Sequence, residues 1–218
     1  MPVTHRYDPD QAPHGARKAM LDRVERGATV LDVGCWSGFA GRYLSASVDA
    51  VMDGIEPDRE MAARAAETYR DVRAQAAEDA FGALAAEGRR YDALLFLDVL
   101  EHLVDPAAVL RAALTLTRPG GRAYVSLPNV AHWSVRKSLL LGRFEYTESG
   151  LLDATHLRFY TAASARRLLE DAGWAVRWTG ASLGPPPLLR LREHQLGVLS
   201  RWPGLFAVQL LFEAEARA

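Results

Sequence analysis

Short apolar runs alternate with amphipathic or alanine-rich segments along most of the chain. The apolar runs predict strands, at residues 30–33, 50–55, 72–76, 91–97, 122–127, 174–179 and 205–214. The segments between them predict helices, at residues 16–25, 38–44, 58–69 and 161–172, with two more after residues 79 and 105. Regular alternation of strands and helices favours an α/β domain built on a mainly parallel sheet.

The most apolar run, residues 91–97, predicts a central strand that is buried on both faces. Asp105 and Pro106 then supply the N-cap and first turn of the next helix. Between strand and helix lie Asp98, Glu101 and His102. Ligands bind at the carboxyl ends of strands in open α/β sheets, so these three side chains are candidates for a site.

A glycine-bearing turn follows the first strand, and the glycines there have the spacing Gly34-x3-Gly38-x2-Gly41. Glycines admit backbone angles closed to other residues, and the N–H groups that open the next helix favour an anionic group. The dinucleotide fingerprint needs a glycine at position 36, where this chain has Trp36, so a pyrophosphate site is disfavoured. Glu56 ends the second strand, about twenty residues past the turn, where a carboxylate accepts hydrogen bonds from ribose hydroxyls.

The run from Leu31 to Gly38 resembles motif I of the class I S-adenosylmethionine-dependent methyltransferases. Residues 98–106, Asp-Val-Leu-Glu-His-Leu-Val-Asp-Pro, followed by Arg-Pro-Gly-Gly at 118–121, resemble motif IV and its sequel in the ubiquinone-biosynthesis type of this class. Residues 128–160 are similar to an insertion of a small-molecule branch that includes methionine-biosynthesis methyltransferase-like proteins. The resemblance implies a three-layer Rossmann-like α/β fold. Its seven-stranded sheet has six parallel strands and a last antiparallel one, with helices on both faces and a lid insertion.

The cofactor that the resemblance implies is S-adenosylmethionine. The positions that would face it are Asp32, Gly34, Cys35, Gly38, Glu56, Ala77, Glu78 and Asp98. Trp36 departs from the motif, and its indole could narrow or cover the pocket. Ala76 stands where the family commonly has an aspartate near the adenine, so the backbone of Ala77 and the carboxylate of Glu78 would take over that contact.

Two arrangements for removing a proton from an acceptor hydroxyl stay open. In the first, a histidine is the general base: His132 and His156 lie in the insertion, and His102 is a further catalytic candidate. In the second, Asp98, Glu101, His102 and His156 hold a divalent cation that lowers the acceptor's pKa. Some methyltransferases that the chain resembles use a Glu-x-x-Glu-His and a later histidine for metal, whereas here Asp98 is one methylene shorter. The plain alternative is that Glu101 and His102 only begin a helix.

At 218 residues, 49% of them hydrophobic, the chain is predicted to form one domain over residues 1–218. An N-terminal arm and helix take up residues 1–27, and residues 128–160 and 181–204 form the lid. With a net charge of −1, the chain lacks the excess of positive charge that is typical of proteins that bind nucleic acid or an anionic membrane, which favours a small-molecule partner. The single cysteine excludes an intrachain disulfide, and no apolar run is long enough to span a bilayer, so a cytoplasmic protein is expected.

The predicted function is methyl transfer from S-adenosylmethionine to a small molecule, with oxygen the preferred acceptor atom and nitrogen or carbon open. One alternative is a catalytically silent methyltransferase-like module that binds an adenosyl ligand or a partner protein. Another is a nucleotide-dependent oxidoreductase, which Trp36 and the glycine spacing oppose.

Overall fold

The computed structural model describes residues 15–183 and 202–217, and within them one sheet carries the fold. Its strands are β1 Thr29–Val33, β2 Val51–Ile55, β3 Asp71–Arg73, β4 Tyr91–Leu97, β5 Thr117–Pro128, β6 Trp174–Leu183 and β7 Ala207–Ala216. They lie in the order β3-β2-β1-β4-β5-β7-β6. Only β7 in this sheet runs antiparallel to its neighbours. The predicted seven-stranded sheet with six parallel strands and a last antiparallel one is confirmed.

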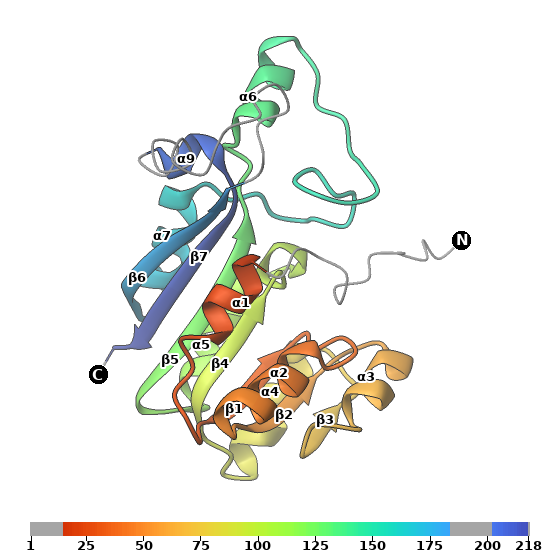
Figure 1. Ribbon diagram of the computed structural model, residues 1–218, viewed down its shortest axis with the longest axis vertical. Coiled ribbons are helices and arrows are strands. Elements are labelled where there is room, and N and C mark those ends of the chain that lie inside the picture. Colours follow the sequence, from red (N-terminus) through yellow and green to blue (C-terminus); the bar gives the residue numbers. More distant parts are fainter. Residues whose placement is uncertain (1–14, 184–201, 218) are drawn as a thin grey trace.

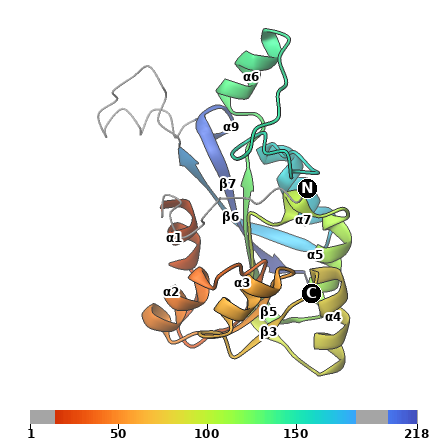
Figure 2. The ribbon, with the colours of Figure 1, turned by 90° about the vertical axis from the view of Figure 1, so that its right-hand side faces the viewer.

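Helices cover both faces of the sheet (Figures 1 and 2). One face carries α1 Gly15–Leu21, α2 Phe39–Val48 and α3 Arg59–Ala65. The other carries α4 Ala77–Ala86, α5 Pro106–Leu114 and α7 Ala162–Asp171. Each face has its own apolar core, so the fold has the three layers that the alternating pattern predicts.

The central strand β4 contributes to both cores. Leu94 and Phe96 point into the core beneath α4, α5 and α7, whereas Ala93 and Leu95 point into the core beneath α1 and α2. All four side chains are at most 2% exposed. The near-continuous apolar run therefore reflects a strand buried on both faces, as predicted.

Strand lengths are where local pattern and structure differ most. The predicted sixth strand, residues 174–179, continues to Leu183 because β6 pairs with β7 over its whole length, from Trp174 opposite Ala216 to Leu183 opposite Ala207. Residues 181–183, predicted as lid, are thus part of the sheet. The rest of the second predicted lid segment up to residue 201, and residues 1–14 of the predicted arm, lie outside the described residues.

The segment after β5 leaves the sheet and returns over the carboxyl end of β4. It contains α6 Trp133–Leu140 and a long loop, which project beyond the ends of β4 and β5 (Figure 1). The loop is fastened on its return, since the backbone N–H groups of Leu157 and Arg158 both donate to the carbonyl of Glu101. That carbonyl belongs to η1 Leu100–His102, a single 3₁₀ turn just after β4. A further short helix, α9 Pro203–Phe206, precedes β7. Over the described part of the chain, every helix is too short or too polar to cross a membrane.

Candidate functional site

The turn between β1 and α2 is built on left-handed backbone at three positions. Gly34 and Gly38 have φ of +74° and +89°, and Trp36 between them has φ of +47°. A Cβ on Gly34 would lie 2.7 Å from Val99, and one on Gly38 would lie 3.0 Å from Ala65. The glycines are therefore required both by conformation and by close packing. Trp36 takes the same kind of conformation at a steric cost of about 1–2 kcal/mol.

Glu56 ties this turn to the end of β2. One carboxylate oxygen accepts the backbone N–H of Trp36 at 2.9 Å and the other accepts that of Asp58 at 2.9 Å. The side chain is 5% exposed, and burial raises the pKa of its carboxyl group. Each carboxylate oxygen has a second lone pair, so Glu56 can still accept hydrogen bonds from two ligand hydroxyls.

Asp32, near the end of β1, is engaged by a tyrosine that the sequence did not single out. The hydroxyl of Tyr69 donates to Asp32 Oδ2 at 2.6 Å and accepts the backbone N–H of Gly41 at 2.9 Å. Asp32 is 3% exposed, and burial raises its pKa to about 7 against the lowering effect of Tyr69. Cys35 is also buried, which raises the pKa of its thiol. Tyr69 follows α3 with no local motif, so only the packed structure identifies it.

Ala77 and Glu78 occupy the first turn of α4, just after β3. The side chain of Ala77 is buried and that of Glu78 is exposed. The N-cap is Ala76, whose side chain cannot cap the helix. The first N–H groups of α4 therefore lie beside the carboxyl end of β2, on the same edge as Glu56.

Asp98, just after β4, is held by three segments far apart in the sequence. Its Oδ1 accepts from Ser126 Oγ at 2.8 Å and from Gln209 Nε2 at 2.7 Å, and its Oδ2 accepts from Arg17 Nη2 at 2.9 Å. The residue itself has φ of +58°. Arg17 comes from α1 and Gln209 from β7, so neither could be assigned to this site by spacing along the chain.

Glu101, His102 and His156 come together at the carboxyl end of β4. One potential ligand atom from each lies within 4.8 Å of the other two, and these three residues form such a group among the described residues. Glu101 is 1% exposed, and within that part of the chain neither of its carboxylate oxygens has a hydrogen-bond partner. Burial and the charge of Asp98 raise the pKa of Glu101 far above its usual value. His156 Nδ1 is likewise buried and unpartnered there.

The structure separates two other predicted site residues, Asp98 and His132, from this group. Asp98, predicted as a cation ligand, has its carboxylate engaged by Arg17, Ser126 and Gln209 and lies outside the group of three. His132, predicted as a base, is the N-cap of α6, and its Nδ1 lies 2.8 Å from Ser134 Oγ. Burial lowers the pKa of both His132 and His156, which favours the neutral imidazoles that a base or a metal ligand requires.

Aromatic rings extend from His156 toward solvent. Phe159 lies 6.2 Å from the His156 ring, and the rings of Phe144 and Tyr146 lie 5.8 and 6.3 Å from Phe159. Phe144 is 42% exposed and Tyr146 58% exposed. These three residues form an exposed aromatic cluster beside the buried carboxylate and imidazoles.

A family model described as a methyltransferase domain matches residues 5–178. This chain belongs to the methyltransferase-domain family. Its relatives include the ubiquinone biosynthesis O-methyltransferase of Aeromonas salmonicida (strain A449), which is 32% identical over 162 residues, covering 69% of this chain and 64% of that protein. The corresponding enzyme of Xylella fastidiosa (strain M23) is 33% identical over 134 residues, 56% of this chain and 53% of that one. The chain thus spans about half to two thirds of the length of these relatives.

Solved methyltransferase structures share the fold. A SAM-dependent methyltransferase from Archaeoglobus fulgidus has a TM-score of 0.61 at 14% identity, covering 91% of this chain and 90% of that one. Magnesium protoporphyrin IX methyltransferase from Synechocystis, with bound SAM, has a TM-score of 0.56 at 19% identity, covering 92% and 76%. The prediction of a class I S-adenosylmethionine-dependent methyltransferase is confirmed for family and fold.

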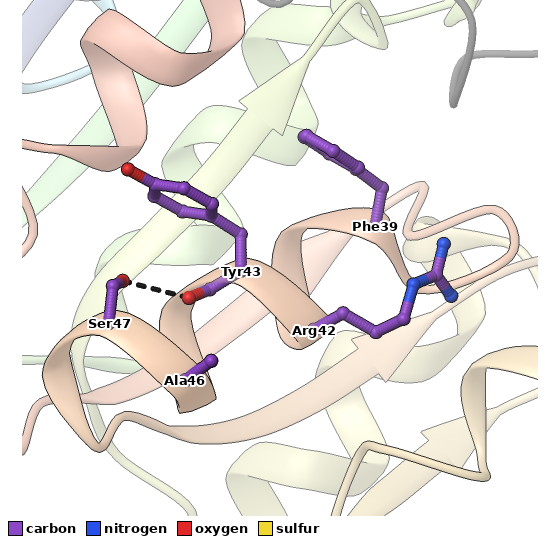
Figure 3. Close-up of a pocket in the computed structure, with 5 residues that line it drawn as sticks. All are labelled: Phe39, Arg42, Tyr43, Ala46 and Ser47. Atoms are coloured by element: carbon purple, nitrogen blue, oxygen red, sulfur yellow. Dashed lines mark hydrogen bonds between the residues drawn. The ribbon is translucent and has the colours of Figure 1, made fainter.

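One groove on this methyltransferase fold lies apart from the candidate site. It runs along α2 and is lined by Phe39, Arg42, Tyr43, Ala46 and Ser47 (Figure 3). These residues lie on the side of α2 opposite its buried residues Ala40, Gly41 and Leu44. A second cavity lies between α6 and the following loop, lined by Ser134, Val135, Ser138, Thr147, Leu151 and Leu152. Leu151 and Leu152 belong to the loop that leads to His156.

Proposed function

We propose that this chain transfers the methyl group of S-adenosylmethionine to a hydroxyl oxygen of a small molecule, and that Glu101, His102 and His156 hold a divalent cation at the acceptor. The family and fold support the cofactor, and two relatives are O-methyltransferases by name. The cation rests on one observation: the carboxylate of Glu101 and the Nδ1 of His156 are buried together at the carboxyl end of β4, with no hydrogen-bond partner among the described residues.

The adenosyl end of the cofactor is assigned to the turn after β1 and to Glu56. The carboxylate of Glu56 is fixed by two backbone N–H groups and retains lone pairs for both ribose hydroxyls. The adenine edge is assigned to Ala77 and Glu78, at the start of α4. Asp32, Gly34, Cys35 and Gly38 shape the floor of the same turn.

The methionine end is assigned to Asp98 and its partner Arg17. A carboxylate suits the amino group of the methionine moiety, and a guanidinium suits its carboxylate, so the 2.9 Å ion pair of these side chains offers both charges in one place. The Asp98 side chain is about one sixth exposed and Arg17 one seventh, so the pair is accessible from the edge of the sheet.

The residues of the cation site fit a hard or borderline divalent metal. One carboxylate and two imidazoles are oxygen and nitrogen donors that suit Mg²⁺, Mn²⁺ or Fe²⁺. Such an ion supplies Lewis-acid stabilisation of an ionised acceptor hydroxyl. The chain's own contribution is to hold the three donors close together and to keep water from the carboxylate, which is 1% exposed.

Methyl transfer depends more on aligning the acceptor oxygen with the methyl carbon than on acid catalysis. The acceptor oxygen attacks the methyl carbon, the carbon–sulfur bond breaks, and S-adenosylhomocysteine leaves. The acceptor's proton would pass to solvent, because a bound cation would lower the pKa of the hydroxyl and His156 would be one of the cation's ligands. The exposed cluster of Phe144, Tyr146 and Phe159 offers stacking surface for an aromatic or apolar acceptor.

The decisive experiment is thermal unfolding of the full chain with S-adenosylhomocysteine, NAD or Mn²⁺, each with and without EDTA. We expect S-adenosylhomocysteine to stabilise the fold by about 2.7 kcal/mol at a hundredfold excess over its Kd, and NAD to have no effect. Mn²⁺ should stabilise the wild type. Glu101→Gln should abolish the Mn²⁺ effect and keep that of S-adenosylhomocysteine.

His132→Ala is the matched control, because it removes another buried histidine of the lid that lies outside the group of three. It should keep the response to Mn²⁺. Stabilisation by NAD in place of S-adenosylhomocysteine would overturn the cofactor assignment. An unchanged melting curve with Mn²⁺ would remove the cation and leave a single histidine as the base.

A further inference from the structure

His102 contacts one residue of the lid loop through its inner ring nitrogen. Its Nδ1 lies 3.2 Å from the carbonyl oxygen of Thr155 and 3.2 Å from the Thr155 hydroxyl. Thr155 therefore presents two oxygens to one nitrogen. A carbonyl oxygen only accepts hydrogen bonds, so its contact requires a proton on Nδ1.

The buried carboxylate of Asp153 determines whether the Thr155 hydroxyl donates or accepts a hydrogen bond toward His102. Asp153 Oδ1 accepts the Thr155 hydroxyl at 2.7 Å and the Thr155 backbone N–H at 2.8 Å. Asp153 is 8% exposed. A hydroxyl has one proton, so donating it to Asp153 leaves Thr155 Oγ1 only as an acceptor toward His102. Both oxygens of Thr155 then favour the same tautomer, with the proton on Nδ1 and the lone pair on Nε2.

The same turn of the loop carries the second histidine. The backbone N–H of His156 donates to the carbonyl of Asp153, and that of Ala154 donates to the carbonyl of Thr147. The Nδ1 of His156 has no hydrogen-bond partner in the described part of the chain. The loop thus holds the His102 imidazole at one nitrogen, through Thr155. Metal-binding histidines in proteins are commonly held in this way.

We propose that Asp153 and Thr155 are positioning residues that fix His102 in its Nδ1–H tautomer and so direct the Nε2 lone pair to the group it forms with Glu101 and His156. The inference rests on the proposed function for the identity of the bound cation. The tautomer itself is a property of the protein without any ligand. A single turn of the lid therefore supplies one donor, His156, and orients another, His102.

The test combines ring ¹⁵N NMR of the metal-free protein with Mn²⁺ titration followed by electron paramagnetic resonance. Spectra are taken at alkaline pH, where a histidine ring is neutral and its tautomer can be assigned. In the wild type we expect His102 to carry its proton on Nδ1. Thr155→Val removes the hydroxyl acceptor and keeps the carbonyl, so it should lower the Nδ1–H fraction and weaken Mn²⁺ binding about threefold, whereas Thr155→Ser should preserve both.

Thr147→Val is the matched control. It removes a threonine hydroxyl from the same loop, where that hydroxyl donates to the carbonyl of Ser149 at 2.9 Å and not to a histidine. It should leave the tautomer and the Mn²⁺ affinity at wild-type values. Asp153→Ala should resemble Thr155→Val, because without the carboxylate the threonine hydroxyl can direct its proton toward His102 Nδ1.

The outcomes separate this inference from the proposed function. Absence of Mn²⁺ binding by the wild type would count against the proposed cation, while the NMR spectra would still test the tautomer. A wild-type His102 with its proton on Nε2 would overturn the inference, even if Thr155→Val failed to fold. Equal Mn²⁺ affinities and tautomers in the wild type and Thr155→Val would also overturn it and leave the cation site standing.

Discussion

Several individual residues at this site have a shifted pKa or a backbone conformation that is uncommon for their type. Asp32 and Glu101 are carboxylic acids with almost no exposure to water, and burial raises the pKa of both. Trp36 and Asp98 have left-handed backbones although they are not glycines. Strain and shifted pKa values concentrate at functional sites, and here they concentrate along the carboxyl ends of β1, β2 and β4.

Asp32 allows a test of pH dependence at the scale of one residue. Its pKa is about 7 in the folded chain and about 4 when unfolded. The folded state thus binds the Asp32 proton more tightly than the unfolded state does. This proton binding contributes fully to the free energy of unfolding below the unfolded pKa, and the contribution is lost as pH rises toward 7. Asp32→Asn should remove this loss, which amounts to as much as about 4 kcal/mol.

The measurement is urea unfolding of the wild type and Asp32→Asn without ligand, from about pH 4 to about pH 8. The variant's stability relative to the wild type should rise across this range and level off above it. A constant difference at every pH would show that Asp32 titrates normally in the folded chain.

At the scale of elements, one connection carries most of the candidate chemistry. The stretch from β4 through η1 to α5 holds Asp98, Glu101 and His102 within a few residues. It is closed by Asp105, whose side chain accepts the N–H of Ala108 at 2.9 Å, with Pro106 at the first helical position. The N-cap sets where the helix begins and therefore how the 3₁₀ turn before it is held.

Asp105→Ala removes that cap and should lower the free energy of unfolding by about 1 kcal/mol. Asp105→Ser, which keeps a capping oxygen, should restore most of it. Chemical denaturation of the three proteins measures the difference. The cap would have no role in holding α5 if the alanine and serine variants were equally stable.

Across the whole molecule, the last strand joins segments from both ends of the chain. β7 lies between β5 and β6, contributes Gln209 to the Asp98 cluster, and carries the buried carboxylate of Glu213. Glu213 pairs with Arg23, just after α1, and with Arg122 of β5. The first helix, the sheet and the C-terminal strand therefore converge on one carboxylate.

Glu213→Ala should destabilise the chain by about 1–3 kcal/mol, because it leaves two arginines without their buried partner. The decrease in the free energy of unfolding should be smaller than for a fully buried ion pair, because the Arg23 and Arg122 side chains are 34% and 38% exposed and can be rehydrated. Glu215→Ala is the control from the same strand. Its pair with Arg177 is largely exposed, so the change should cost under about 1 kcal/mol. Equal unfolding free energies for the two variants would contradict the account.

The sequence by itself determined the alternation of strands and helices, the doubly buried β4, the glycine turn and the family. Each of these follows from residues close together in the chain, where hydrophobic period, backbone freedom and motif spacing act locally. Glu56, Glu101 and His102 could be found in the same way, because they lie within five positions of the ends of predicted strands. The sequence identified the candidate histidines but did not indicate which of them lie close to Glu101.

Only the tertiary structure decided which of them meet. It brought His156 to Glu101 and His102, kept His132 as a helix cap, and gave Asp98 to Arg17, Ser126 and Gln209 instead of to the cation group. It also added Tyr69 beneath the glycine turn and Thr155 against His102. The His132 cap is local, but the other contacts join residues dozens of positions apart, and their geometry depends on sheet order and loop packing, which no local pattern encodes.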